Sequence, residues 1–170
     1  MIRDAGEADR DALRALHLAS WRANYGVALP EAYLREVLPG VMAEKWAAFP
    51  LDRSAVTLVA DGEDGIGGFV RADVDPVPPL IDNLHTRPGL YGRGIGAALL
   101  RAARDRLAAR GFARCWLTVL ERNPRALAFY RREGGVEEDA YEEDFLGFRV
   151  RVRRIGFATM ADPGFDPGSG

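Results

Sequence analysis

A glycine-rich loop lies between a strand predicted over residues 80–86 and a helix predicted over residues 95–110. Glycine has no Cβ, so its main chain turns sharply and its N–H groups can approach a ligand closely. The helix behind the loop adds about half a positive charge at its N-terminus. Together these features predict an anion site suited to a phosphate or pyrophosphate, flanked by Arg87 and Arg93. The glycines are Gly89, Gly92, Gly94 and Gly96.

Two common phosphate-binding motifs fit the loop poorly. A nucleotide-hydrolysing P-loop needs a lysine after its last glycine, and the only lysine of the chain is Lys45. A dinucleotide fold needs three spaced glycines; Gly94 and Gly96 supply two, but Leu99 occupies the third position. Glu121 follows the next predicted strand and could serve as the ribose-binding acid, so a dinucleotide-binding protein stays as an alternative.

The loop resembles that of the GNAT superfamily of N-acyltransferases, whose phosphate loop reads Gln/Arg-x-x-Gly-x-Gly/Ala. Tyr91 stands where that motif has Gln or Arg, which leaves the main-chain amides to bind the diphosphate of acetyl-CoA. The resemblance implies that the strand before the loop pairs with the pantetheine arm and polarises the thioester carbonyl. The cofactor contacts that it implies are Leu84, His85, Thr86, Tyr91, Gly92, Arg93, Gly94, Ile95, Gly96 and Ala97.

A second segment, residues 121–130, resembles the N-x-x-A-x-x-F/L-Y helix of the same superfamily. By this resemblance Asn123 and Phe129 contact the cofactor, and Tyr130 protonates the departing thiolate. Asn123 and Tyr130 are almost two helical turns apart, so they share a face. A thiolate of pKa about 8.5 leaves more easily when a phenol of pKa about 10 stands ready to donate. Gly134-Gly135 follows in place of the usual Gly-Phe.

An amine nucleophile must be neutral to attack, which calls for a base or a water chain that leads to one. Thr118 occupies the position where some superfamily members carry a glutamate base, so we expect Asp82 to take this role, with His85 as the other candidate. Alternation along the strand puts the two on opposite faces. Trp21 and Tyr25, one helical turn apart, are candidates for the acceptor pocket.

The pattern of apolar residues predicts an α/β fold. We expect a mixed, mostly antiparallel sheet of the GNAT type, with a central parallel strand pair and helices on both faces. Pro39-Gly40 is expected to end one helix before another begins. The predicted helices are 7–25, 30–39, 42–49, 95–110 and 123–132. The predicted strands are 2–4, 55–60, 66–74, 80–86, 114–120, 136–141 and 149–157.

Length and composition restrict the class of protein. The 170 residues, 48% of them hydrophobic, predict one domain over residues 1–158 and a flexible tail over 159–170. A net charge of −2 excludes the basic surface of a nucleic-acid binder. One cysteine and two histidines cannot form a zinc site, so no metal is expected. The chain lacks a secretory signal and a membrane span, which predicts a cytoplasmic protein.

The resemblance implies an enzyme that acetylates a primary amine by direct attack in a ternary complex, with no covalent enzyme intermediate. The acceptor, a small-molecule or peptide amine, is not readable from the sequence, and a homodimer is compatible with it. A non-catalytic acyl-CoA sensor of the same fold is the main alternative. Turnover with any amine would separate the enzyme from the sensor.

Overall fold

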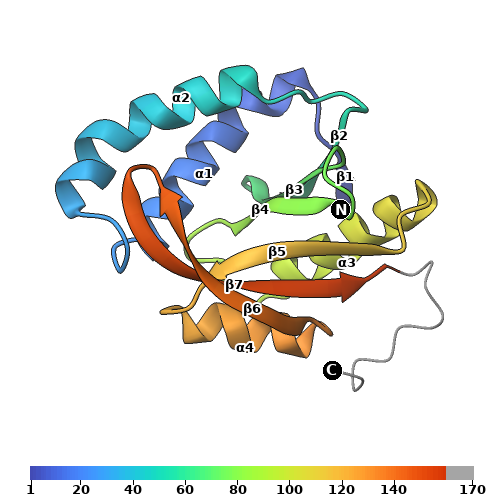
Figure 1. Ribbon diagram of the computed structural model, residues 1–170. Coiled ribbons are helices and arrows are strands. Elements are labelled where there is room, and N and C mark those ends of the chain that lie inside the picture. Colours follow the sequence, from blue (N-terminus) through green and yellow to red (C-terminus); the bar gives the residue numbers. More distant parts are fainter. Residues whose placement is uncertain (160–170) are drawn as a thin grey trace. The chain divides into compact units, whose positions relative to one another are not determined.

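The computed structural model describes residues 1–159 of the chain. Its strands are β1 (Ile2–Asp4), β2 (Ala55–Gly62), β3 (Gly65–Asp73), β4 (Leu80–Thr86), β5 (Arg114–Leu120), β6 (Val136–Phe145) and β7 (Phe148–Ala158) (Figure 1). Its main helices are α1 (Arg10–Asn24), α2 (Leu38–Ala48), α3 (Ile95–Ala109) and α4 (Pro124–Arg132). A short 3-10 helix (Glu7–Asp9) precedes α1, and a π-helical turn (Tyr33–Val37) precedes α2.

The strands are hydrogen-bonded in the order β1-β2-β3-β4-β5-β7-β6. β4 and β5 are parallel, with Leu80 opposite Trp116, whereas β1–β2, β5–β7 and β6–β7 are antiparallel. The expected mixed sheet with a central parallel pair is therefore confirmed. The described chain divides into two compact units, which are treated separately: residues 1–72 with 83–103, and residues 73–82 with 104–159.

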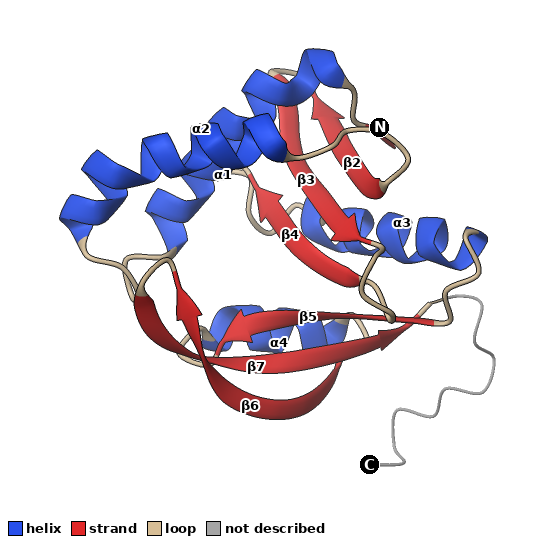
Figure 2. Ribbon diagram, turned by 45° about the horizontal axis from the view of Figure 1, so that its top comes forward, coloured by secondary structure: helices blue, strands red, loops and turns tan. Residues whose placement is uncertain are grey.

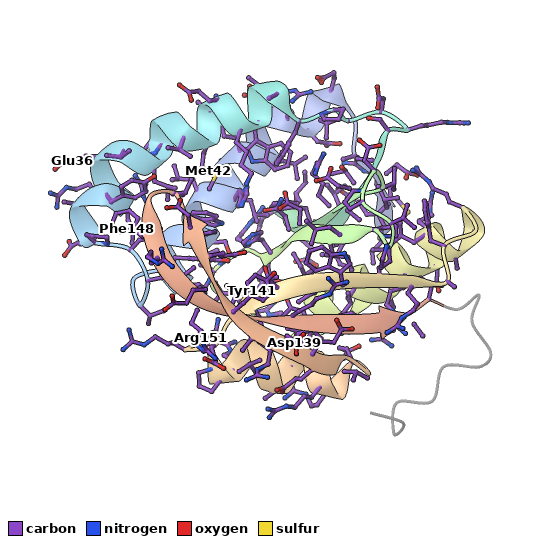
Figure 3. The ribbon with its side chains drawn as sticks, in the orientation of Figure 1. Glu36, Met42, Asp139, Tyr141, Phe148 and Arg151 are labelled. Carbon is purple, nitrogen blue, oxygen red and sulfur yellow. The ribbon has the colours of Figure 1, made fainter. Side chains whose placement is uncertain are left out.

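In the first unit, β2, β3 and the second half of β4 lie side by side (Figure 2). Aromatic side chains of α1 and α2 pack on one face, where Trp46 and Phe69 are in edge-to-face contact at 5.3 Å and Met42 is fully buried (Figure 3). The start of α3 packs on glycine in β3. A Cβ on Gly68 would lie 2.9 Å from Ile95 Cγ2, so only glycine lets this helix approach so closely.

The predicted break at Pro39-Gly40 is wrong. The π-helical turn of residues 33–37 runs directly into α2, and both residues lie inside the helix. A proline in a helix lacks the N–H that would bind the carbonyl four residues earlier, and this loss normally ends or kinks the helix. The continuous helix therefore needs another partner for that carbonyl.

Arg22 of α1 supplies that partner. In a regular α-helix the N–H at position 39 would bind the carbonyl of Arg35, and here Arg22 Nη2 donates to that oxygen at 3.5 Å. Arg22 Nε donates at 3.2 Å to the carbonyl of Leu34, whose regular partner Leu38 instead closes the wider turn onto Tyr33. The tertiary contact replaces the missing local hydrogen bond, which no local pattern in the sequence reveals.

The second unit pairs β5 with β7 and β7 with β6, and α4 lies along these strands (Figures 1 and 2). Cys115, Leu117 and Val119 on β5 are buried, and burial raises the pKa of the Cys115 thiol to about 11, which leaves it protonated and unreactive at neutral pH. Alternation on β7 is confirmed: Val150 and Val152 are buried, and Arg151 is exposed (Figure 3).

Gly135, between α4 and β6, shows why the usual aromatic residue is absent after Gly134. A Cβ at Gly135 would lie 2.6 Å from Ile155 Cγ2 and 2.9 Å from the ring of Phe157. Both neighbours belong to β7, so this strand fills the space with its own apolar side chains.

We therefore expect Gly135→Ala to lower the free energy of unfolding by about 1–3 kcal/mol, the usual cost of overpacking. The measurement is urea unfolding at neutral pH. Gly40→Ala is the matched control, because a Cβ at Gly40 meets nothing within 4 Å and alanine favours the helix. Equal unfolding midpoints for the two variants would contradict the packing at Gly135.

Two features are absent from residues 1–159. No helix there is long and apolar enough to cross a membrane, and no three His, Cys, Asp or Glu side chains are grouped to hold a metal ion. Thr159, the first residue of the predicted tail, is buried, and its N–H donates to the carbonyl of Ala113 at 2.9 Å. The rest of that tail lies outside the described residues.

Candidate functional site

The glycine-rich loop has the open main chain that an anion site needs. Gly89, Gly92 and Gly94 have φ of +89°, +77° and +77°, a conformation that favours glycine. A Cβ at any of the three would meet no atom within 4 Å, so the loop faces open space. The first turn of α3 closes when the Ala98 N–H binds the Gly94 carbonyl at 3.0 Å. The N–H groups before Ala98 have no carbonyl inside the helix to bind, and they are placed for an external anion.

The loop is held firmly where it leaves β4. The N–H of Arg87 donates to the carbonyl of Gly67 at 2.8 Å, and Leu90 N–H closes a turn onto the Arg87 carbonyl at 3.0 Å. The guanidinium of Arg87 does not reach toward the loop as expected. It donates instead to the carbonyls of Asp64 and Ile66 on the β2–β3 hairpin. Of the two arginines that the sequence predicts beside the loop, Arg93 therefore stays a candidate for binding the anion, whereas the guanidinium of Arg87 is used elsewhere.

The side chains of β4 alternate as the sequence predicts. Asn83 and His85 are buried on one face, whereas Asp82 is exposed on the other. Leu84 and Thr86 share the face of Asp82 and are half-buried. Of the two candidate bases, only Asp82 therefore has a side chain open to solvent.

His85 is held as a neutral side chain inside the first unit. Its Nδ1 lies 2.8 Å from the hydroxyl of Ser20 on α1, and its ring lies 4.5 Å from that of His17. Burial lowers the pKa of His85 to about 3. A group with this pKa binds a proton too weakly to serve as a general base near neutral pH. The structure therefore gives the imidazole a packing and hydrogen-bonding role.

His17 occupies the centre of the same core. Its Nδ1 accepts a hydrogen bond of 3.0 Å from the indole of Trp46, and its ring is in edge-to-face contact with Phe69 at 5.4 Å. No hydrogen-bond partner of its Nε2 is present among the described residues. Burial, followed by the charges of His85 and Lys45, lowers the pKa of His17 well below its ordinary value.

These two histidines predict acid sensitivity. Because the folded-state pKa of His85 is lowered, the unfolded chain binds a proton that the folded chain does not between about pH 6.5 and 3. The contribution of neutral His85 to the free energy of unfolding is therefore fully present above about pH 6.5 and is lost as the pH is lowered. We expect His85 alone to remove about 2 kcal/mol of unfolding free energy between pH 6.5 and 4.5.

Urea unfolding of the wild type and of His85→Gln across that range measures the effect. Glutamine can accept from Ser20 but does not titrate, so its stability curve should be flatter by close to one proton. Parallel curves for the two proteins would show that His85 does not titrate as expected.

Two functional candidates on α1, Ser20 and Asn24, were not predicted from the sequence. Asn24 Nδ2 donates to the hydroxyl of Tyr91 in the loop at 3.0 Å and to the Ser20 carbonyl at 2.8 Å. A polar chain thus runs from Tyr91 through Asn24 and Ser20 to His85. The i, i+4 spacing of Ser20 and Asn24 places them on one helical face, which is the only local signal that could have identified them.

The predicted acceptor residues lie on the same part of α1. The rings of Trp21 and Tyr25 are stacked, with centroids 4.6 Å apart and planes 16° apart. Trp21 is buried, and Tyr25 is half-buried at the end of the helix. Tyr25 thus gives the stacked pair a partly exposed ring.

The remaining predicted residues lie on α4, in the second unit. Asn123 is the N-cap of this helix, and its side-chain oxygen accepts from the Ala126 N–H at 3.0 Å. Phe129 and Tyr130 are in edge contact at 5.1 Å, and the Tyr130 ring lies 6.2 Å from Phe157 of β7. Packing and capping therefore fix the orientation of this helix within its unit.

Comparison with known proteins gives consistent results. The model of the family described as "Acetyltransferase (GNAT) family" matches residues 11–135. The uncharacterized N-acetyltransferase YuaI of Bacillus subtilis is 24% identical over 160 residues, which cover 91% of this chain and 90% of that protein. Streptothricin acetyltransferase of Streptomyces lavendulae is 36% identical over 86 residues, which cover 49% of this chain and 46% of that protein.

Solved structures show the same fold. The PaiA N-acetyltransferase of Thermoplasma acidophilum, solved with coenzyme A, has a TM-score of 0.72 at 20% identity, covering 90% of this chain and 96% of its own. The ribosomal-protein-S18-alanine N-acetyltransferase of Escherichia coli has a TM-score of 0.69 at 19% identity, covering 98% of both chains.

Proposed function

Because the chain belongs to the GNAT family of acetyltransferases, we propose that it transfers the acetyl group of acetyl-CoA to a primary amine by direct attack in a ternary complex. The observation that carries the proposal is the loop of residues 89–97, whose glycines at positive φ open onto empty space in front of the first turn of α3. This cradle suits a diphosphate such as that of coenzyme A, with which the similar PaiA N-acetyltransferase was solved. For the dinucleotide-binding alternative, the third glycine of the motif is missing, because Leu99 occupies its position.

In the proposed complex the main-chain amides from Gly92 to Ala97 bind the diphosphate, with Arg93 beside them. The main chain of β4 at Leu84, His85 and Thr86 pairs with the pantetheine arm. On α4, Asn123 and Phe129 contact the same arm. Asn123 is already the helix cap through its side-chain oxygen, so its amide nitrogen is the atom left for such a contact.

Acetyl-CoA supplies the thioester whose acetyl group is transferred. The amine nitrogen bonds to the acetyl carbon as the carbon–sulfur bond breaks. Asp82, the exposed carboxylate of β4, receives the proton that the amine loses, directly or through water. Tyr130 donates its phenolic proton to the leaving sulfur, so that charge does not build up on the thiolate.

For the acceptor we propose a primary amine that contacts the stacked pair of Trp21 and Tyr25. Support comes from similar proteins, which include acetyltransferases of streptothricin, of mycothiol, of spermidine and of a ribosomal-protein alanine. The chain spans about half of the streptothricin enzyme and under a third of the mycothiol enzyme. A small-molecule amine and a peptide amine are therefore both compatible acceptors.

A panel of amines incubated with acetyl-CoA tests the proposal. It should contain polyamines, aminoglycoside-like amines, amino acids and peptides with a free N-terminus. Release of free thiol, in step with loss of the amine, is expected for at least one member of the panel. Binding of coenzyme A without turnover on any amine would favour the acyl-CoA sensor instead.

A further inference from the structure

Asn24 connects the end of α1 to the phosphate loop. Its amide nitrogen carries two hydrogens, and the structure uses both: one bond goes to the Tyr91 hydroxyl and one to the Ser20 carbonyl. Tyr91 and Asn24 are 67 positions apart in the sequence, yet both lie in the first unit. Tyr91 is also the residue at which the loop departs from the family motif.

The anchor behind Asn24 is buried. Ser20 is 2% exposed, and its hydroxyl lies 2.8 Å from Nδ1 of His85, which is 9% exposed. The Ser20 hydroxyl donates to Nδ1 or accepts from it according to which ring nitrogen of His85 carries the hydrogen. The low pKa of His85 keeps this imidazole neutral across the physiological range. A buried hydrogen bond of this kind fixes the Ser20 turn against β4.

Asn24, which these hydrogen bonds hold in place, is the last residue of α1. The last four carbonyls of a helix have no N–H to bind within the helix, so the final turn frays unless another group anchors it. The turn contains the stacked pair, Trp21 and Tyr25, and the Tyr25 N–H bonds to the Trp21 carbonyl at 2.8 Å. Any change in the loop that moves the Tyr91 hydroxyl therefore acts on the turn that presents these two rings.

We propose that Asn24 is a positioning residue that couples coenzyme A binding at the loop to order in the last turn of α1, and thereby to the acceptor amine. This rests on the proposed function. Because coupling between two ligands is reciprocal, the acceptor and coenzyme A each strengthen binding of the other by the same factor. One net hydrogen bond transmits the effect, so we expect a factor of about two to ten.

Hydrogen–deuterium exchange with mass spectrometry tests the coupling, with and without saturating coenzyme A. In the wild type, coenzyme A should slow exchange in the loop peptide (residues 90–99) and, about two- to tenfold, in the α1 peptide (residues 20–29). In Tyr91→Phe, which removes only the hydroxyl, the loop should stay protected and the effect on the α1 peptide should disappear. Asn24→Ala should give the same result through the other partner.

Tyr141→Phe is the matched control, because it removes an exposed hydroxyl on β6 of the second unit (Figure 3). It should leave both peptides as in the wild type. A purely structural bond would change exchange equally with and without coenzyme A, so the ratio of the two isolates the coupling. Loop protection without α1 protection in the wild type would overturn the inference and leave the proposed function standing. No response of either peptide would count against the proposed function itself.

Discussion

Replacing Tyr130 with phenylalanine is expected to lower kcat about a hundred- to ten-thousandfold, the usual contribution of a general acid. The Kd for coenzyme A should stay within about twofold, because the phenyl ring keeps the edge contacts with Phe129 and Phe157 that hold α4 in place. Steady-state turnover with the best amine of the panel, together with calorimetric titration of coenzyme A, measures the two quantities.

The pH dependence and an unrelated tyrosine sharpen this test. The wild-type rate should fall at high pH as a phenol deprotonates, whereas the rate of Tyr130→Phe should not show this fall. That difference would identify Tyr130 as the proton donor. Tyr141→Phe should keep the wild-type rate. If Tyr130→Phe loses less than about tenfold in kcat, Tyr130 is not the proton donor and its role is packing alone.

Gly94→Val is expected to weaken coenzyme A binding at least about a hundredfold, the equivalent of two lost hydrogen bonds to a charged ligand. Gly94 has φ of +77°, which a β-branched residue adopts only under strain. The loop must therefore shift, and its amides and the first turn of α3 then point away from the diphosphate. The new side chain also enters the open space in front of the loop.

Gly6→Val is the matched control for this variant. Gly6 likewise has nothing within 4 Å of a built Cβ, but its φ of −126° suits valine. Calorimetric titration of both variants, with circular dichroism to verify folding, gives the comparison. Wild-type affinity in folded Gly94→Val would show that this loop does not bind the cofactor.

Local patterns in the sequence predict much of the fold. The residue patterns locate β4 and β5 without error, and α3 ends one residue before its predicted end. Nearby residues determine elements of this kind. In α4, for example, the side chain of Asn123 caps the helix by accepting from an N–H three residues away. The glycine loop also follows directly from its residues, because positive φ at Gly92 and Gly94 requires glycine.

Features that depend on distant residues could not be predicted in this way. Pro39 is expected to end a helix because it lacks an N–H, whereas Arg22 of another helix donates to the carbonyls of Leu34 and Arg35. Arg87 is close to the loop in sequence, yet carbonyls of the β2–β3 hairpin take up its guanidinium. His85 is itself a predicted cofactor contact and a candidate base, but burial, followed by the charge of Lys45, lowers the pKa of its imidazole to about 3.

Titration of coenzyme A into the wild-type protein by calorimetry tests the central assignment most directly. The glycine loop at the start of α3 predicts saturable binding of one coenzyme A per chain, lost in Gly94→Val and retained in Gly6→Val. Pantetheine, which lacks the diphosphate of coenzyme A, should bind far more weakly than coenzyme A. Folded wild-type protein that shows no binding heat at two temperatures, or that binds pantetheine as tightly as coenzyme A, would contradict the assignment.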